Sequence, residues 1–192
     1  MNSDAQEPIP SLGMEDVREA VLAAAEAYGS SRFIIVGRAS LAVTMPESDP
    51  LLRATMDVDL FPPWDESKAA VWAAADLSIG RLSPFRREHG FYVERVAEWT
   101  TRQLLPGWEQ RVSAFEVNGI QARAIHPFDL ICAKLHAGRP KDRAFIKKAL
   151  EHEVVKLTEF QAFIHDQSGD ETLLSSLMKK LTDAQAYVEE EV

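Results

Sequence analysis

Two aspartates, Asp57 and Asp59, stand two positions apart in the run TMDVDLF, which otherwise alternates like a buried strand. Side chains at positions i and i+2 of a strand point to the same face, about 6.7 Å apart at the backbone. Two carboxylates so close repel each other unless a positive charge lies between them. Mg²⁺, or Mn²⁺ in its place, prefers oxygen ligands and supplies that charge. The alternative is a solvated sheet face that carries the pair by chance.

A second pattern precedes the aspartates. The run FIIVG-RAS is typical of a buried strand that ends at Gly37 and continues into a short helix. Glycine allows a close approach to the backbone, and the free N–H groups at a helix start attract phosphate. The Ser40 hydroxyl is a candidate for a further contact. An ordinary strand-to-helix turn is the alternative, but the acidic pair some twenty residues later favours a nucleotide site with one part for phosphates and one for the metal.

The elements that must position these residues follow from the hydrophobic periodicity. Asn118-Gly119, between two alternating runs, predicts a tight hairpin with positive φ at both positions. Asp65 is a candidate N-cap. Helices are expected over 14–28, 38–45 and 65–77, and strands over 33–37, 55–61, 91–96, 111–117 and 120–125.

The last third of the chain is predicted to be helical. Pro127 opens a helix that runs to Ala137 with Gly138 as its C-cap, and Pro140 begins another. A capping box of Thr158 and Gln161 predicts a third helix, and 171–188 a fourth. The order of elements predicts an α+β fold: a mixed sheet flanked by helices over 1–126, and a helical C-terminal region over 127–192 packed on that core.

Composition narrows the class of protein. The formal net charge of -9 disfavours broad binding to nucleic acid, but the stretch 134–148 holds six Lys and Arg residues against one acid, so a local basic site fits. The single cysteine, Cys132, is predicted to be a core residue and fits a reducing compartment. Since no signal peptide or apolar run long enough for a membrane span is visible, we expect a cytoplasmic protein with no membrane partner.

These residues resemble the nucleotidyltransferase superfamily, in which a strand, a Gly-Gly or Gly-Ser turn and a helix precede an Asp-x-Asp strand. More closely, the chain resembles the AbiEii/AbiGii toxin branch and its relatives. That branch carries the run R-x-T-x-D-x-D, which is matched here by Arg53, Thr55, Asp57 and Asp59.

Two further motifs extend the resemblance over residues 33–150. The branch carries the pattern D-L-x-x-x-K-L-x-A-G-R-x-K-D-x-x-F, and DLICAKLHAGRPKDRAF at 129–145 matches it at each specified position. The segment LPGWEQR at 105–111 is also similar to a segment of these relatives. The chain departs from the pattern at Arg38, which replaces the small residue of the phosphate turn and either binds the triphosphate or blocks its approach.

The resemblance implies the roles of individual residues. The implied catalytic residues are Asp57, Asp59 and Lys134, and the implied third metal ligand is Glu116, with Glu94 as the alternative. The nucleotide-binding candidates are Gly37, Arg38, Ser40, Thr55, Arg139 and Lys141, although the last two are also explained as acceptor contacts or solvated side chains.

The implied activity is Mg²⁺-dependent transfer of a nucleoside monophosphate from an NTP to a hydroxyl of RNA, notably a tRNA end, or of a protein. The implied biological role is that of a toxin in a toxin–antitoxin or phage-defence pair, with an antitoxin protein as partner. The alternative is a catalytically silent nucleotidyltransferase fold that serves as a binding or regulatory module.

Overall fold

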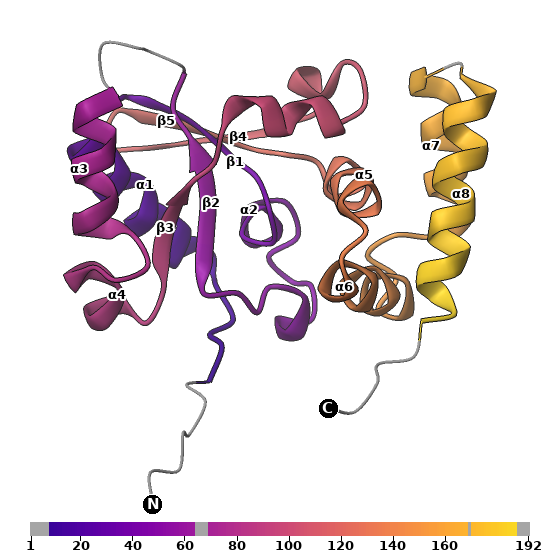
Figure 1. Cartoon of the computed structure of the whole chain (residues 1–192), viewed down its shortest axis with the longest axis horizontal. Helices are drawn as coiled ribbons and strands as arrows, with labels where there is room; N and C mark the ends of the chain where they lie inside the picture. Colours follow the sequence, from indigo (N-terminus) through magenta and orange to yellow (C-terminus); the bar gives the residue numbers. More distant parts are fainter. Residues whose placement is uncertain (1–7, 64–68, 169, 188–192) are drawn as a thin grey trace, which may run out of the picture.

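The computed structural model describes residues 8–63, 69–168 and 170–187 and contains one mixed five-stranded sheet (Figure 1). Its strands lie in the order β3-β2-β1-β5-β4. The strands are β1 (Arg32–Ile35), β2 (Asp57–Phe61), β3 (Tyr92–Arg95), β4 (Ser113–Val117) and β5 (Ile120–Ala124). The central strand β1 pairs antiparallel with β2 and parallel with β5, and the edge strand β3 runs parallel to β2. The sheet with its flanking helices confirms the predicted α+β class.

Helices cover both faces of this sheet, with α1 and α3 on one side and α5 to α8 on the other (Figure 1). The α-helices are α1 (Met14–Tyr28), α2 (Ser40–Thr44), α3 (Ala69–Ile79), α4 (Pro84–His89), α5 (Pro127–Ala137), α6 (Pro140–Glu151), α7 (Leu157–Ser168) and α8 (Glu171–Gln185). The connections in the described residues contain the 3-10 helices η1 (Pro50–Leu52), η3 (Glu98–Gln103) and η4 (Trp108–Gln110).

Two hydrophobic clusters lie on the two faces of the sheet, and alternate residues of the central strand β1 contribute to one or the other. Phe33 and Ile35 of β1 belong to the cluster beneath α1 and α3, whereas Ile34 and Val36 pack against the cluster that α5 to α8 cover. Successive side chains of a strand point to opposite faces, so one short strand contributes to both cores. The division at residue 126 remains a prediction, although the second cluster is built mainly from residues after it.

Local signals account for most of the element boundaries. Asn118 and Gly119 have φ of 48° and 80°, which confirms the tight hairpin between β4 and β5. Gly138 ends α5 in the left-handed conformation, as predicted. The prediction that Thr158 caps a helix was wrong, because α7 already begins at Leu157. Helix α4 was not predicted from the sequence. Asp65 lies outside the described residues.

No helix in the described ranges combines the length and the apolar character that a membrane crossing requires.

Candidate active site

The two aspartates face away from the first core and toward the C-terminal helices. Val58 and Leu60 are fully buried in the cluster beneath α1 and α3. Because β2 alternates, Asp57 and Asp59 project from its other face. The parallel register places Glu94 of β3 directly beside Asp59 and Tyr92 beside Asp57. Three carboxylates therefore stand on one face of two neighbouring strands.

Asp57, Asp59 and Glu94 form what we call the acidic cluster. Each offers a carboxylate oxygen, and the three oxygens lie within 4.8 Å of one another. Burial, then the negative charges of Asp57 and Glu94, raise the pKa of Asp59 to about 7, while Lys134 and Lys141 oppose that rise. This donor set of carboxylate oxygens fits Mg²⁺ or Mn²⁺, whose charge would relieve the repulsion.

The structure places Glu116 far from the acidic cluster, so the metal-ligand assignment from sequence needs a correction. Glu116 is exposed on β4, the opposite edge of the sheet from β3, where it pairs with Gln121. Three strands separate it from β3. Of the two glutamates considered from sequence, Glu94 is the one that lies beside the aspartates.

Thr55 and Gly37 fix the positions of the two aspartates of the acidic cluster. The Thr55 hydroxyl, nearly buried, donates a hydrogen bond to the Asp57 carboxylate and fixes its orientation. Gly37 has φ of 66°, and a Cβ atom built on it would lie only 2.2 Å from Asp59 Oδ2. The phosphate-turn glycine is thus required by the close approach of Asp59 as well as by its backbone conformation.

Gly37→Ala is expected to displace the Asp59 carboxylate and to weaken Mn²⁺ affinity by at least about tenfold, as expected for a disturbed carboxylate ligand. Calorimetric titration of Mn²⁺ measures this. The matched control is Gly119→Ala, which has φ of 80° and no atom within 4 Å of the new Cβ. Both variants carry a left-handed alanine, costing about 1–2 kcal/mol of folding free energy. Equal metal affinities in the two variants would contradict the steric argument.

A cleft of about 680 Å³ opens in front of the acidic cluster and brings together most of the residues singled out from the sequence. Gly37, Arg38, Thr55, Lys134, Arg139 and Lys141 line it together with the three carboxylates. Ser40 does not: its side chain is fully buried and its hydroxyl donates to the Gly37 carbonyl oxygen at 2.8 Å. Ser40 therefore stabilises the turn and is not presented to a ligand.

Arg38 reaches across the cleft wall. Its Nη1 donates to the Ala54 carbonyl oxygen at 2.9 Å, and its guanidinium lies over the Phe145 ring at 4.9 Å. Burial lowers the pKa of Arg38, while the charges of Asp142 and Asp57 oppose this shift. The side chain is half-buried, so it is held in place and still borders the cleft.

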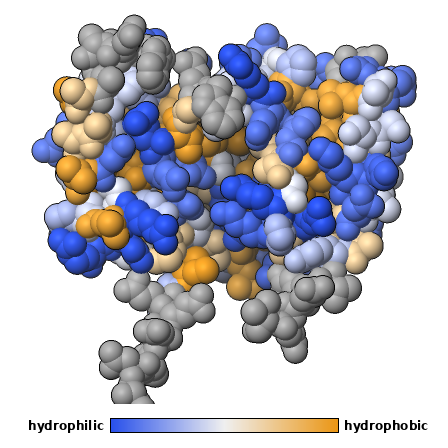
Figure 2. Space-filling model, viewed as in Figure 1, coloured by the Kyte–Doolittle hydropathy of each residue, from blue (hydrophilic) through white to orange (hydrophobic). Residues whose placement is uncertain are grey.

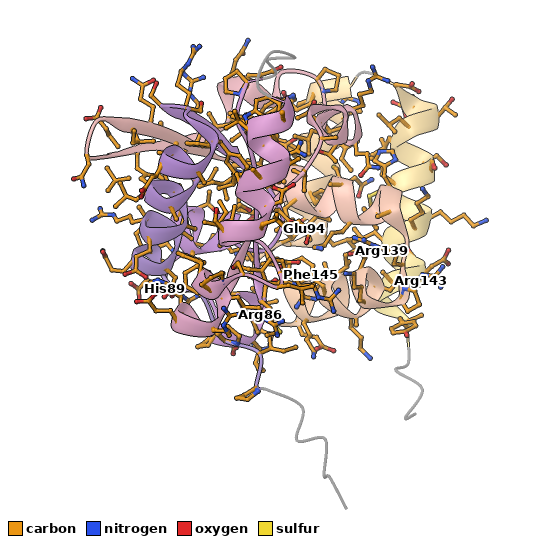
Figure 3. The ribbon with its side chains drawn as sticks, turned by 60° about the vertical axis from the view of Figure 1, so that its left-hand side comes forward. Arg86, His89, Glu94, Arg139, Arg143 and Phe145 are labelled. Atoms are coloured by element: carbon orange, nitrogen blue, oxygen red, sulfur yellow. The ribbon has the colours of Figure 1, made fainter. Side chains whose placement is uncertain are left out.

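Asp142 organises the basic side of the cleft. The carboxylate is fully buried and accepts hydrogen bonds from Lys134 Nζ at 3.0 Å and from Arg139 Nε at 2.5 Å and Nη2 at 3.2 Å. Lys134 also lies over the Phe145 ring at 5.0 Å. We call Arg38, Lys134, Arg139 and Lys141 the basic wall; Figure 3 shows Arg139 and Phe145 beside Glu94.

Sequence reasoning missed the role of Asp142, although its motif was recognised. An acid in the first turn after Pro140 is explained by the helix dipole alone, so its tertiary partners gave no separate signal. The segment LPGWEQR is likewise structural: Arg111 binds the fully buried Asp129 through Nη2 at 2.8 Å and Nε at 3.1 Å. His126 caps α5 by accepting from the Phe128 N–H, as a structural residue would.

Comparison with known proteins identifies the family. Residues 14–189 match the profile of a family described as "Nucleotidyltransferase of unknown function (DUF6036)". No curated protein and no solved structure matches the chain. The match covers both the sheet and the C-terminal helices, and it supports the superfamily inferred from Gly37, Asp57 and Asp59 without extending to the AbiEii branch.

Proposed function

Since the chain belongs to the DUF6036 family of nucleotidyltransferases, we propose that it moves a nucleoside monophosphate from an NTP to a hydroxyl of RNA or protein in a Mg²⁺- or Mn²⁺-dependent reaction. The observation that carries the proposal is one cleft that places an acidic cluster opposite a basic wall. The carboxylates of Asp57, Asp59 and Glu94 would hold the metal. The basic wall would bind the triphosphate, since guanidinium and ammonium groups make charge-assisted hydrogen bonds to phosphate oxygens.

The reaction needs little covalent chemistry from the protein. The acceptor hydroxyl oxygen attacks the α-phosphorus, forming a new O–P bond while the bond from that phosphorus to the bridging oxygen breaks. Pyrophosphate leaves toward the basic wall, and the hydroxyl proton passes to a carboxylate of the acidic cluster. The metal supplies charge neutralisation when bound. Thr55 and Gly37 contribute by fixing the directions of Asp57 and Asp59.

We further propose the biological role that the AbiEii/AbiGii resemblance implies, a cytoplasmic toxin controlled by an antitoxin protein. The resemblance rests on motifs whose charged residues are in contact here: Arg111 with Asp129, and Lys134 and Arg139 with Asp142. Co-expression of the chain with its genomic neighbour tests this role. Growth arrest by the chain alone, relieved by the neighbour, is expected; normal growth at equal protein levels would contradict a toxin.

Labelled NTPs test the transfer itself. Each of the four NTPs is incubated with the chain, Mg²⁺, total RNA and cell lysate, and EDTA-treated samples serve as controls. A labelled macromolecular product that EDTA prevents is expected. Thermal stabilisation by MgNTP without any labelled product would favour the second candidate, a silent binding module.

The second candidate, a silent binding module, is favoured by Arg38, which stands where the superfamily has a small residue. Substitution of Arg38 offers a direct test. Because the guanidinium borders the cleft, we expect Arg38→Gly to weaken NTP affinity by about 1.5–3 kcal/mol, the contribution of a hydrogen bond to a charged group. Arg38→Lys keeps a charge but loses the bidentate geometry, so its NTP affinity should lie between those of wild type and Arg38→Gly. Titrations with MgATP and MgCTP measure the NTP affinities of wild type and of both variants. Tighter binding by Arg38→Gly would mean that Arg38 blocks the turn.

A further inference from the structure

A second pocket, lined by arginines, lies beside the edge strand β3. It has a volume of about 490 Å³ and is lined by Arg81, Arg86 and Arg87 with apolar and small neighbours. We call it the arginine pocket. Arg81 and Arg87 are exposed, and neither makes an ion pair within residues 8–63, 69–168 and 170–187. Hydrophilic side chains predominate at this α4 corner of the molecule, with hydrophobic atoms among them (Figure 2). In a chain of net charge -9, three clustered guanidinium groups mark a site for an anion.

The arginine pocket adjoins the cleft that holds the acidic cluster. Met56, which precedes Asp57, lines both this pocket and the larger cleft. The guanidinium of Arg86 lies over the ring of Tyr92 at 6.0 Å, and Tyr92 is the register partner of Asp57. The Tyr92 hydroxyl is 3.5 Å from Glu94 Oε2. A surface of cation, aromatic ring and carboxylate therefore leads from α4 to the acidic cluster.

Positive charge thus lies on both sides of the acidic cluster. The basic wall comes from α5, α6 and the turn at Gly37, whereas the arginine pocket comes from α4 and the residues before it. Strands β2 and β3, which carry the acidic cluster, lie between α4 and the α5–α6 pair in Figure 1. In-line displacement requires the attacking oxygen to approach opposite the leaving pyrophosphate. If pyrophosphate leaves along the basic wall, the acceptor enters from the side of the arginine pocket.

We infer that the arginine pocket binds the backbone phosphates of the acceptor, and that the acceptor is a single polynucleotide strand whose terminal hydroxyl reaches the acidic cluster. This inference rests on the proposed transfer reaction. The terminal hydroxyl oxygen forms the bond to the α-phosphorus, pyrophosphate leaves, and the strand grows by one nucleotide.

Chemistry favours a polynucleotide over an acidic peptide as the anion. Guanidinium groups match the paired oxygens of a phosphodiester, and an adjacent aromatic ring gives a base a surface for stacking. A strand also carries its last phosphates at a fixed distance from its terminal hydroxyl, so phosphates in the arginine pocket set the position of the nucleophile. If carboxylates of a flexible peptide bound here instead, they would not fix the position of the peptide's own acceptor hydroxyl.

Fluorescence anisotropy with a labelled single-stranded RNA oligonucleotide tests the inference on the full chain. Arg81→Ala combined with Arg87→Ala is expected to weaken RNA binding by about tenfold or more. It is also expected to reduce the slope of log Kd against log salt by about 1.4, since each phosphate contact on a single strand contributes about 0.7. The matched control, Arg32→Ala with Arg123→Ala, removes two exposed arginines from β1 and β5 and should leave both quantities unchanged.

The outcomes separate this inference from the proposed function. Loss of RNA affinity and of label transfer to RNA in the variant with Arg81→Ala and Arg87→Ala, with unchanged MgNTP affinity, supports the inference. RNA affinity that is unchanged when Arg81 and Arg87 are both replaced by alanine overturns it. Transfer of label to protein and not to RNA also overturns it, while the proposed function stands. If the chain binds neither Mn²⁺ nor NTP, both the proposed function and this inference are overturned.

Discussion

Replacement of both Asp57 and Asp59 by asparagine is expected to abolish metal binding while leaving the metal-free fold intact or more stable. In the native protein, burial and then the repulsion within the acidic cluster raise the pKa of Asp59 to about 7, and removing the negative charges relieves that repulsion. Metal charge neutralisation is worth several kcal/mol in the transition state. Nucleotidyl transfer should therefore fall by about a thousand-fold or more, since each 1.36 kcal/mol is about tenfold in rate.

Calorimetric titration with Mn²⁺ and thermal unfolding with and without EDTA measure this expectation. Wild type should gain stability on adding metal, and the double variant should not. Glu94→Gln should weaken metal binding, whereas Glu116→Gln, on the far edge of the sheet, should leave it unchanged. Undiminished Mn²⁺ affinity in the double variant, or a loss in Glu116→Gln alone, would contradict the assignment of the acidic cluster.

Residues that share one strand or one helix turn were predictable, because local periodicity decides them. The alternation of TMDVDLF placed Asp57 and Asp59 on one face, and the strand–glycine pattern identified Gly37 as a special backbone position. The caps at Gly138 and the hairpin at Asn118 followed from backbone preferences of single residues. In each case the signal comes from neighbouring positions in the sequence, although the close approach of Asp59 to Gly37 was not visible from it.

Residues that depend on which strands are neighbours were not predictable from the same signals. Glu94 and Glu116 both stand on short alternating strands, and periodicity does not reveal that β3 pairs with β2 while β4 lies at the opposite edge. The order of the strands is a long-range property, because it depends on pairing between segments that are far apart in the sequence. Ser40 was misplaced for a related reason: its hydroxyl satisfies a backbone carbonyl of its own turn, an interaction that competes with any ligand.

The C-terminal helices show how a local explanation conceals a tertiary role. Lys134 was predicted to enter the cleft, and it does line it. Its partner Asp142 had a sufficient local explanation as a helix-stabilising acid after Pro140, so nothing pointed to the buried contacts it makes. A buried carboxylate with two cationic partners becomes visible only when α5 and α6 are packed together.

Asp142→Ala is expected to cause a large loss of fold stability. It removes a fully buried carboxylate and leaves Lys134, which lies near Arg38, without its ion-pair partner. Breaking a buried ion pair by deleting one partner costs about 3–5 kcal/mol of unfolding free energy. The hydrogen bonds from Arg139 and the charge of Lys134 outweigh burial and hold the pKa of Asp142 below its usual range, so this stabilisation is present at neutral pH and lost on strong acidification.

Asp129→Ala is the matched control for this loss. Asp129 is equally buried and paired with Arg111, but neither residue lines the cleft. Urea denaturation should therefore show a comparable loss of stability in both variants. NTP affinity, measured at a low temperature where both remain folded, should fall only in Asp142→Ala, by about tenfold or more. Equal NTP affinities in the two variants would confine Asp142 to a structural role.

The direction of the change in NTP affinity decides what Asp142 does in the native protein. Burial lowers the pKa of Lys134, and Asp142 opposes that shift. Without the carboxylate, the pKa of Lys134 should fall further and Arg139 should lose its fixed orientation, so the triphosphate would bind more weakly. Tighter binding by Asp142→Ala would instead mean that Asp142 competes with the triphosphate for the same cations. In that case Lys134 and Arg139 must leave Asp142 before a nucleotide binds, and the ion pairs seen here hold the basic wall in a closed state.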